Sequence, residues 1–237
     1  MNHELLTFVT TADGSKTIYN SEVGENYHSR HGALQESRHV FLNSSLIYFL
    51  ENHSKVSPPG GDLEGAVSVL EVGFGTGLNF LLSADYCVDN KLKLDYTGIE
   101  AYPLTAEMIA QTGYDQYIPP TTWKSFTEQY ANALKGAVHI GEHCLLEIAN
   151  CSLLDFESDQ QFDVIYYDAF ASIHQPEMWD MKAISHTLSF LKPGGVFVTY
   201  AITGNLKRII KSLGLRVEKV PGAPGKREML RAIQSAG

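Results

Sequence analysis

Short apolar runs alternate with stretches of helical periodicity from Ala66 to the end of the chain. The runs predict strands over 67–72, 94–100, 144–148, 162–167 and 196–200. Strands that alternate with helices are typical of βαβ units in a parallel sheet. Two further runs, 215–220 and 227–233, are joined by a connection too short for a helical crossover, so they should pair as an antiparallel hairpin. The pattern predicts an α/β fold whose sheet is mostly parallel.

The first fifty residues follow a different pattern. Runs at 5–10 and 16–20 flank a glycine-containing turn and predict a β-hairpin. One face of a helix is then predicted from apolar or small residues at positions 40, 41, 44, 47, 48 and 50. The Pro-Pro-Gly-Gly cluster at 58–61 ends that helix and marks a linker. We therefore expect a hairpin-and-helix extension over 1–57 and a main domain over 58–237.

Composition narrows the class of protein. The 237 residues are 44% hydrophobic and 19% charged, which is ordinary for a soluble globular protein, and no apolar run is long enough to span a bilayer. The N-terminus has no secretory signal, so a cytoplasmic location is expected. Three cysteines without a C-x-x-C pair indicate buried thiols rather than disulfides or zinc ligands, and the histidines have no metal-site spacing.

Charge is distributed unevenly along the chain. The net charge is −9, yet the segment from Lys192 onward carries +7, with nine Lys or Arg against Glu218 and Glu228, which leaves −16 for the rest. Clustered cations are what phosphate contacts require. A charge run is also common on an ordinary solvated face. The asymmetry permits a polyanionic substrate and does not by itself demand one.

A glycine-rich turn follows the first strand of the main domain. Gly73, Gly75 and Gly77, with Phe74 between them, stand where open α/β sheets bind ligands. A dinucleotide fingerprint would need Gly or Ala at position 78, and this chain has leucine there. The turn, with the acidic residue Glu71 two places upstream, instead resembles motif I of class I methyltransferases. That resemblance implies S-adenosylmethionine as the cofactor, with Glu71 near its amino-acid end.

The next two strands end in polar residues that suit a nucleoside. Glu100 at the end of the second strand can accept both ribose hydroxyls, one on each carboxylate oxygen. The alternative is a surface glutamate at the start of a helix. Asn150 follows the third strand, where an amide oxygen could accept the adenine amino group. We expect both residues to contact the cofactor.

The fourth strand delivers Asp168-Ala169-Phe170 to the same sheet edge. A carboxylate two residues from an aromatic ring suits an amine acceptor carried on a base, since methyl transfer requires a nitrogen lone pair held in line with the methyl carbon. Direct proton transfer from an alkylamine to an ordinary aspartate is uphill by roughly six pKa units, about 8 to 9 kcal/mol. We therefore expect Asp168 to orient the amine, or, in the alternative, only to cap the segment that follows.

Several segments together resemble the methyltransferase domain of the MnmC family, including its stand-alone MnmD type. The resemblance rests on Tyr27 and on the segments 31–42, 72–80, 168–171, 176–179 and 226–230. It implies a Rossmann-like methyltransferase domain over 58–237 and a tRNA methyltransferase that converts 5-aminomethyl-2-thiouridine to 5-methylaminomethyl-2-thiouridine at the wobble position. Because the oxidase domain of bifunctional members is absent from this sequence, a separate enzyme is expected to supply the aminomethyl substrate.

The resemblance also implies roles for individual residues. Asp168 and Phe170 would be catalytic, and Asp168 would also border the cofactor. The substrate would be bound by Tyr27, Arg38, Trp179, Lys226 and Arg227. Position 150 departs from the family pattern, because Ala149-Asn150 stands where Gly-Asp is expected.

Other functions remain open at this stage. The acidic majority of the chain would suit an S-adenosylmethionine-dependent N-methyltransferase acting on a small amine or a protein. A non-catalytic cofactor-binding protein would have no need of Asp168. A nicotinamide oxidoreductase is disfavoured by Leu78.

Overall fold

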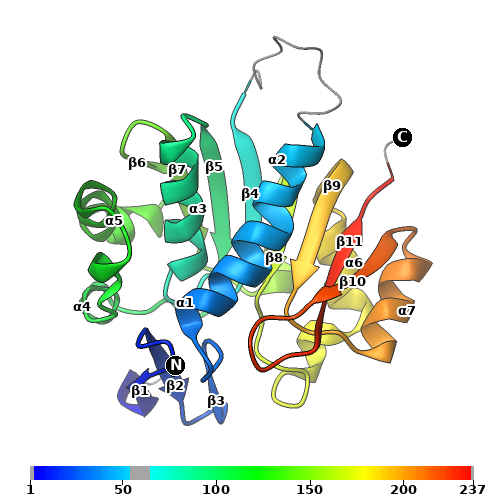
Figure 1. Cartoon of the computed structure of the whole chain (residues 1–237), viewed down its shortest axis with the longest axis horizontal. Helices are drawn as coiled ribbons and strands as arrows, with labels where there is room; N and C mark the ends of the chain where they lie inside the picture. Colours follow the sequence, from blue (N-terminus) through cyan, green and yellow to red (C-terminus); the bar gives the residue numbers. More distant parts are fainter. Residues whose placement is uncertain (1–2, 54–64, 236–237) are drawn as a thin grey trace.

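A computed structural model describes residues 3–53 and 65–235 of the chain. Its centre is an eight-stranded sheet in the order β10-β11-β9-β8-β4-β5-β7-β6 (Figure 1). Five strands pair in parallel: β4 (Val67–Val72), β5 (Leu94–Ile99), β7 (Cys144–Ala149), β8 (Phe162–Tyr167) and β9 (Leu191–Thr199). Three pair antiparallel at the two edges: β6 (Val138–Ile140), β10 (Arg216–Pro221) and β11 (Glu228–Ile233).

The predicted sheet is confirmed almost strand by strand. Every strand expected in the main domain is present, and β10 and β11 form the expected antiparallel hairpin. The short strand β6 was not anticipated, because its three residues, Val-His-Ile, carry too little pattern to stand out. The strand β9 begins five residues earlier than expected, at Leu191, and runs through the sequence Lys-Pro-Gly-Gly.

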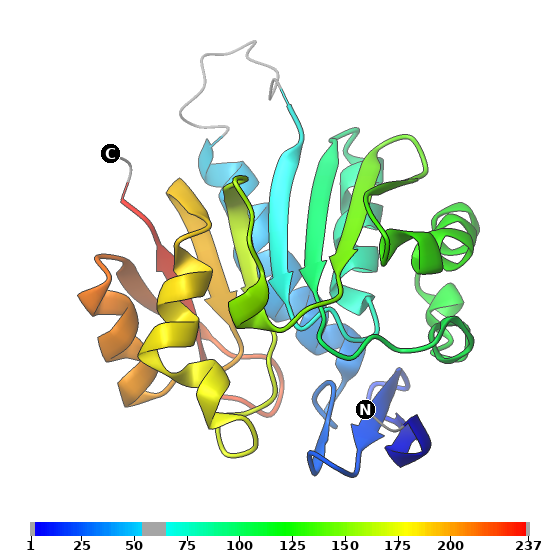
Figure 2. The ribbon, with the colours of Figure 1, turned by 180° about the vertical axis from the view of Figure 1, so that it is seen from behind.

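Helices cover both faces of the sheet (Figures 1 and 2). One face carries α3 (Leu78–Asp89) and α5 (Pro120–Ala133), and the other carries α6 (Met181–Leu188) and α7 (Gly204–Ser212). Adjacent strand residues point to opposite faces, so Val69 lies in one core cluster and Leu70 in the other. Because both faces are covered, all six residues of β4 are buried.

The N-terminal region forms a small sheet and a long helical segment. The sheet contains β1 (Leu6–Thr10), β2 (Lys16–Asn20) and β3 (Glu25–Asn26), and the first two pair as the predicted hairpin. Short helices complete the fold: η1 (His3–Leu5), α4 (Ala106–Ala110), η3 (Tyr114–Gln116), η4 (Leu153–Asp155) and η5 (Pro176–Trp179). The small sheet lies just beyond the edge at which the parallel strands end (Figure 2).

The predicted N-terminal helix exists, but its geometry differs from the expected one. It runs as α1 (Ala33–Glu36), η2 (Ser37–Ile47) and α2 (Tyr48–His53), and η2 is π-helical. A π-helix bonds residue i to i+5 and turns more widely than the 3.6-residue period assumed from sequence. As a result Ser45 and Leu46 are fully buried, while Ile47, expected on the inner face, is only half-buried.

The helical segment packs into the main core. Its residues Val40 and Phe41 share a buried cluster with those of α3 and of the central strands. The proposed boundary between 57 and 58 and the cluster at 58–61 fall outside the described residues, so the domain division stays a prediction. Cys87 and Cys144 are buried thiols, as expected, and Cys151 is half-buried. Within residues 3–53 and 65–235, no helix is long and apolar enough to cross a membrane, and no cluster of metal-ligating side chains occurs.

Candidate functional site

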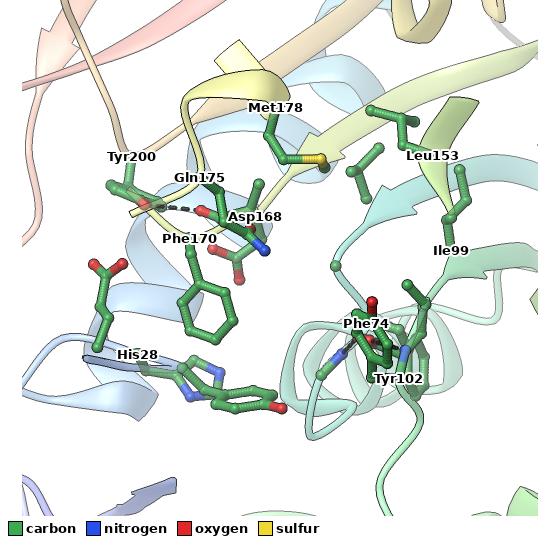
Figure 3. A pocket seen from close by; sticks show the side chains of 18 of the residues that line it. His28, Phe74, Ile99, Tyr102, Leu153, Asp168, Phe170, Gln175, Met178 and Tyr200 are labelled. Carbon is green, nitrogen blue, oxygen red and sulfur yellow. Dashed lines mark hydrogen bonds between the residues drawn. The ribbon is translucent and has the colours of Figure 1, made fainter. Parts of the chain in front are cut away.

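A pocket of about 560 Å³ opens at the edge where the parallel strands end. Residues that follow β4, β5, β7 and β8 form its inner walls, and residues 25–30 and Glu36 of the N-terminal region close its outer side. Figure 3 shows Ile99 and Leu153 at one end of this pocket and Asp168, Phe170 and Tyr200 at the other. Its volume suits a ligand the size of a nucleoside.

The glycine turn forms one wall of the pocket. Gly73 has φ +86°, and a Cβ added there would lie 2.5 Å from the Asp168 carbonyl oxygen, so only glycine fits between the loops that follow β4 and β8. Phe74, Gly75 and Thr76 also line the pocket. Gly77 does not line it. It precedes α3 at φ +77°, where a side chain would meet the ring of Phe74.

Glu100 lies in the pocket and joins two of its loops. One carboxylate oxygen accepts the Gly75 backbone N–H at 2.9 Å, and the other accepts the Tyr102 N–H at 2.9 Å. Burial raises the pKa of Glu100 above its usual value, while these two hydrogen bonds lower it. Each oxygen keeps capacity for a further hydrogen bond, so the carboxylate is fixed in place and still able to accept hydroxyl groups.

Glu71 lies behind the pocket wall and does not line the cavity. Its side chain is fully buried, and its two oxygens accept hydrogen bonds from Asn79 at 2.7 Å and from Tyr96 at 2.7 Å. Burial, followed by the charge of Asp168, raises the pKa of Glu71 well above its usual value. The same Asn79 amide donates to Asp168 at 2.9 Å. The Asn79 side chain therefore links Glu71 to Asp168 in the pocket. The sequence analysis assigned Asn79 no role.

Asp168 lies inside the pocket, beside an aromatic corner. Its carboxylate is held by Asn79, and its backbone N–H donates to the Val72 carbonyl at 2.9 Å. Burial, and next the negative charge of Glu36, raise the pKa of Asp168 to about 8. The rings of Phe170 and Tyr27 meet edge to face with centroids 5.2 Å apart.

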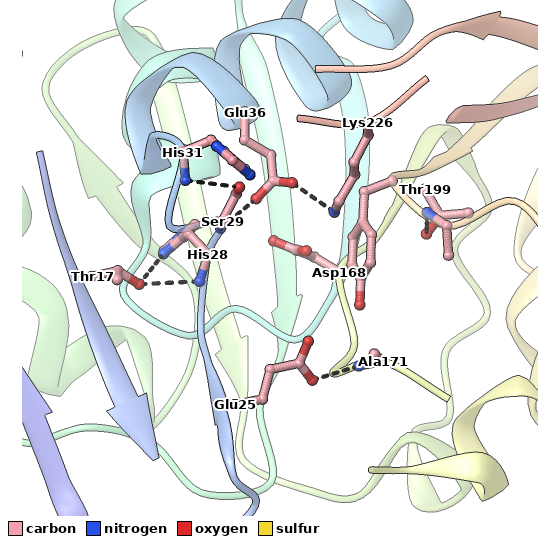
Figure 4. A network of polar contacts seen from close by, with 12 residues as sticks. Thr17, Glu25, His28, Ser29, His31, Glu36, Asp168, Ala171, Thr199 and Lys226 are labelled. Carbon is pink, nitrogen blue, oxygen red and sulfur yellow. Dashed lines mark hydrogen bonds and ion pairs between the residues drawn. The ribbon is translucent and has the colours of Figure 1, made fainter. Parts of the chain in front are cut away.

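A network of charged residues from distant segments surrounds Asp168 (Figure 4). Glu36 is 6% exposed, and its carboxylate accepts the Ser29 N–H at 2.7 Å and pairs with the Lys226 ammonium at 2.8 Å. The same ammonium lies 3.7 Å from the centroid of the Tyr200 ring. Glu25, on the strand β3, accepts the Ala171 N–H at 2.8 Å. Three carboxylates thus lie at this end of the pocket, and the Lys226 ammonium pairs with that of Glu36.

Other lining residues had no role in the sequence analysis. The backbone N–H of His28 donates to the Thr17 hydroxyl at 3.0 Å, which fixes the position of this residue. Burial lowers the pKa of its imidazole to about 4. At the opposite end, the pocket is lined by Ile99, Leu153 and Tyr102. The only sequence signal for that apolar end was the Leu153-Leu154 pair after the third strand.

Besides Glu71 and Gly77, four more of the predicted site residues lie outside the pocket lining. Asn150 is exposed, although Cys151 and Ser152 beside it line the cavity. Trp179 is 6% exposed, and its indole N–H donates to the Phe170 carbonyl at 2.8 Å, so it supports the wall from behind.

The other two are cations at the surface. Arg38 is exposed and does not line the cavity; burial raises the pKa of Asp85 on α3, and the charge of Arg38 opposes that rise. Arg227 is exposed next to Lys226 and does not line the cavity. Of the two neighbouring cations, only Lys226 enters the pocket.

The sequence is similar to a methyltransferase family and to proteins named for the biosynthesis of a modified tRNA nucleoside. The model of a family described as S-adenosyl-L-methionine-dependent methyltransferase matches residues 120–235. The tRNA 5-methylaminomethyl-2-thiouridine biosynthesis bifunctional protein MnmC of Leptospira borgpetersenii is 28% identical over 222 residues, which cover 86% of this chain and 31% of that protein. The protein of the same name from Paracidovorax citrulli is 29% identical over 227 residues, covering 91% and 34%. This chain spans about a third of the length of these relatives.

A solved structure shares the fold. The crystal structure of MNMC2 from Aquifex aeolicus superposes with a TM-score of 0.76 at 24% identity, and the match covers 98% of this chain and 71% of that one. These similarities confirm the class I methyltransferase fold and the resemblance noted from the sequence. The chain thus has the class I methyltransferase fold, its residues 120–235 match an S-adenosyl-L-methionine-dependent methyltransferase family, and most of its length is similar to MnmC proteins.

Proposed function

We propose that this protein is a cytoplasmic tRNA methyltransferase that converts 5-aminomethyl-2-thiouridine at the wobble position to 5-methylaminomethyl-2-thiouridine. The proposal rests above all on the carboxylate of Asp168, which shares one pocket with the glycine turn and the ring of Phe170. An acid beside a cofactor turn and an aromatic surface suits an amine that is attached to a base. Similarity to proteins named for the biosynthesis of this nucleoside supports the choice of substrate.

The residues of the pocket fit the cofactor. Gly73, which has no room for a Cβ against the Asp168 carbonyl, lets the glycine turn and the loop after β8 form one continuous pocket wall. Glu100 offers two fixed oxygens to the ribose hydroxyls, and the apolar end at Ile99 and Leu153 suits the adenine ring. When bound, S-adenosylmethionine supplies the methyl group from its sulfonium centre. Asn150 would contribute to adenine recognition only from the rim, since its side chain is exposed.

The charge at the other end of the pocket favours a cationic amine. Asp168, Glu25 and Glu36 lie around one ammonium, that of Lys226, so the group carries excess negative charge whenever the acids are ionised. An opposite charge nearby stabilises the ionised form of a carboxyl group, so an alkylammonium substrate relieves the repulsion between the acids. The edge-to-face rings of Tyr27 and Phe170 would border the base that carries the amine.

The position of Asp168 alters the expected proton chemistry. With a pKa near 8, its carboxylate lies about two units below a lysine-like amine of 10.4, so direct proton transfer costs about 3 kcal/mol instead of 8 to 9. Asp168 can therefore receive the ammonium proton as well as orient the nitrogen. Asn79 keeps the carboxylate oriented, because it donates to Asp168 at 2.9 Å.

Lys226 and Trp179, which the family resemblance implies as substrate-binding residues, are given indirect roles in this proposal. Lys226 would act inside the pocket by holding Glu36, and Trp179 would act by supporting Phe170. Neither then needs to touch the RNA backbone. The substrate must already carry an aminomethyl group, so we propose that a separate modification enzyme acts first and that no metal takes part.

The proposed function is tested by methyl transfer to tRNA. Purified protein is incubated with labelled cofactor and with tRNA from cells that accumulate the 5-aminomethyl-2-thiouridine form, and the digested nucleosides are separated by mass. Label in 5-methylaminomethyl-2-thiouridine is expected. Label absent from that nucleoside would remove the proposal.

A second candidate is supported by the acidic end of the pocket. Three carboxylates would bind the amine of a small molecule or a protein lysine as readily as an aminomethyl base. The same assay with a mixture of polyamines and a lysine-rich protein, in place of tRNA, separates the two functions. Transfer to these acceptors at rates above those for tRNA would favour the second candidate.

A further inference from the structure

A second concave surface lies between the helix α7 and the edge strand β10. This basic groove has a volume of about 670 Å³. Its lining consists of Gly204, Lys207, Arg208, Lys211, Val217 and Lys219. Four of these six residues are cations, and none is acidic.

The helix side of the basic groove follows from an amphipathic pattern. Leu206, Ile209 and Ile210 are buried against the sheet, which turns the basic residues of α7 outward. Lys207 and Lys211 are four residues apart, so their side chains lie above one another on the same helix face.

The strand side follows from the alternation of β10. Val217 and Lys219 point to the face that the groove uses, while Glu218 between them bonds to Arg231 at 2.8 Å. Lys219 pairs with Glu228 at 3.4 Å, but both side chains are substantially exposed, and an exposed ion pair of this kind is weak. Lys219 therefore remains available to another anion.

Most other basic residues of the C-terminal region are already paired with acids. The pairs are Lys192 with Asp163, Lys226 with Glu36, and both Arg216 and Arg231 with Glu218. Within the described residues, neither Lys207 nor Lys211 makes an ion pair. Three cations without an ion pair in the part of the chain that the structure describes, Lys207, Arg208 and Lys211, thus lie together in the basic groove.

A comparison with α5 argues against an ordinary solvated helix. There Lys124 lies 3.8 Å from Glu128 one turn later, so the two charges compensate. The sequence of α7, Gly-Asn-Leu-Lys-Arg-Ile-Ile-Lys-Ser, contains three cations and no acid, in a chain whose net charge is −9. A like-charged stripe along a groove weakens the fold slightly and is useful when a polyanion occupies it.

The basic groove begins close to the pocket. Tyr200 lines the pocket and Gly204, four positions later along the chain, lines the groove. A fully extended chain covers at most about 3.5 Å per residue, so the two positions lie within about 14 Å. A span of that length is covered by a few nucleotides of one strand.

We propose that the basic groove binds the phosphate backbone of the tRNA a few nucleotides from the base that enters the pocket. The inference rests on the tRNA methyltransferase function proposed above and adds the surface that holds the RNA. Phosphate contacts fix the register of a nucleic acid without reading its sequence. The groove cations Lys207, Lys211 and Lys219 would therefore set where the strand lies, and the pocket alone would select the modified base.

The test removes two groove charges together. The Lys207→Ala/Lys211→Ala variant is compared with wild type for tRNA binding on filters between 50 and about 200 mM salt, and for methyl transfer at varied tRNA concentration. We expect tRNA affinity at low salt to fall roughly three- to tenfold and the slope of log affinity against log salt to decrease by about one to two. The KM for tRNA should rise, while kcat at saturating tRNA should change less than about twofold.

The matched control is Lys124→Ala/Lys135→Ala. It removes the same charge from two exposed lysines, one on α5 and one just after it, at the opposite edge of the sheet (Figures 1 and 2). Circular dichroism and thermal melts establish that both variants fold. A second variant, Lys207→Glu/Lys211→Glu, reverses the charge and should weaken tRNA binding beyond the alanine variant.

The outcomes separate this inference from the proposed function. If wild type methylates tRNA, but the groove variant and the control have the same affinity and salt slope, the groove inference is wrong. If wild type binds tRNA through the groove but transfers no methyl group to it, the proposed function is wrong and the groove inference stands. Loss of binding to anionic lipid vesicles, with tRNA binding unchanged, would identify a membrane as the occupant and overturn the inference.

Discussion

The acidic end of the pocket and the basic groove carry opposite charge, and Tyr200 of the one lies within about 14 Å of Gly204 of the other. In the pocket, Asp168, Glu25 and Glu36 meet a single ammonium. In the groove, four cations have one acidic partner, Glu228, beside them. The contrast fits a substrate that carries a cationic amine on one base and a negatively charged phosphate backbone. The net charge of −9 conceals both regions.

Exposure also separates the two regions. Glu36 in the pocket is 6% exposed, whereas the side chain of Lys219 in the groove is 53% exposed. Salt screens exposed charges and affects buried ones much less. The pocket should therefore respond to pH and the groove to salt, and the following changes test this separation.

The largest expected effect comes from Asp168→Asn. The amide keeps the shape and can still contact Asn79, but it cannot receive a proton, so kcat should fall roughly 10²- to 10⁴-fold. Binding of tRNA should stay within twofold of wild type, because the groove is unaltered. Single-turnover methyl transfer and filter binding measure the two quantities. The control is the exposed Asp159→Asn, and a variant at Asp168 with more than a tenth of wild-type kcat would contradict the proton-acceptor role.

A smaller effect is expected from Glu100→Ala. The substitution removes the carboxylate that bridges Gly75 and Tyr102, and with it the proposed ribose ligand. Hydrogen bonds to a charged group contribute about 1.5 to 3 kcal/mol, so cofactor affinity should fall roughly 10- to 100-fold. Titration calorimetry with the cofactor measures this, beside Glu142→Ala as an exposed control. An unchanged cofactor affinity would remove Glu100 from the cofactor site.

The substitution Glu36→Gln tests the pH response of the pocket. The free-enzyme profile of kcat/KM should rise with pH and level off near the pKa of Asp168, about 8 in wild type. Glu36 raises that pKa, and its removal also frees Lys226, which lowers it. The rising limb should therefore move to lower pH, and the ratio of rates at pH 6.5 and pH 8.5 should increase roughly three- to tenfold. A profile that does not move would disprove the electrostatic coupling.

The smallest effect concerns stability. Because the pKa of Asp168 is raised in the folded state, folding loses stability as pH rises from the unfolded value near 3.8 to about 8. Asp168→Asn removes this loss, so the variant should match wild type near pH 4 and be more stable than wild type at pH 8.5, with a higher Tm. Thermal melts at both pH values check the sign. A variant less stable than wild type at pH 8.5 would contradict it.

Much of the fold could be predicted from the local pattern of apolar and polar residues. The strands β4 and β8 match their predicted bounds, and the hairpin of β10 and β11 followed from the short connection between them. The π-helical turn of η2 could not be predicted, because the same residues satisfy a 3.6-residue period until packing against α3 and the sheet selects the wider turn.

The candidate site was only partly readable. Gly73, Glu100 and Asp168 were found because each follows a strand, and the ends of parallel strands meet at one edge. Glu25, Asn79 and the other partners of Asp168 lie on the N-terminal strand, on a helix and on the closing hairpin, and no spacing in the sequence links them.

The sequence by itself determined the sheet, the glycine turn and the strand-end acids, because backbone periodicity and turn chemistry act over a few residues. Only the tertiary structure decided which cations are paired and which are available. It brought Lys226 to Glu36 and left Lys207 and Lys211 in the basic groove, although all three belong to one basic stretch of the chain. Charge acts over distance in space, so its effect is fixed by packing and not by order along the chain.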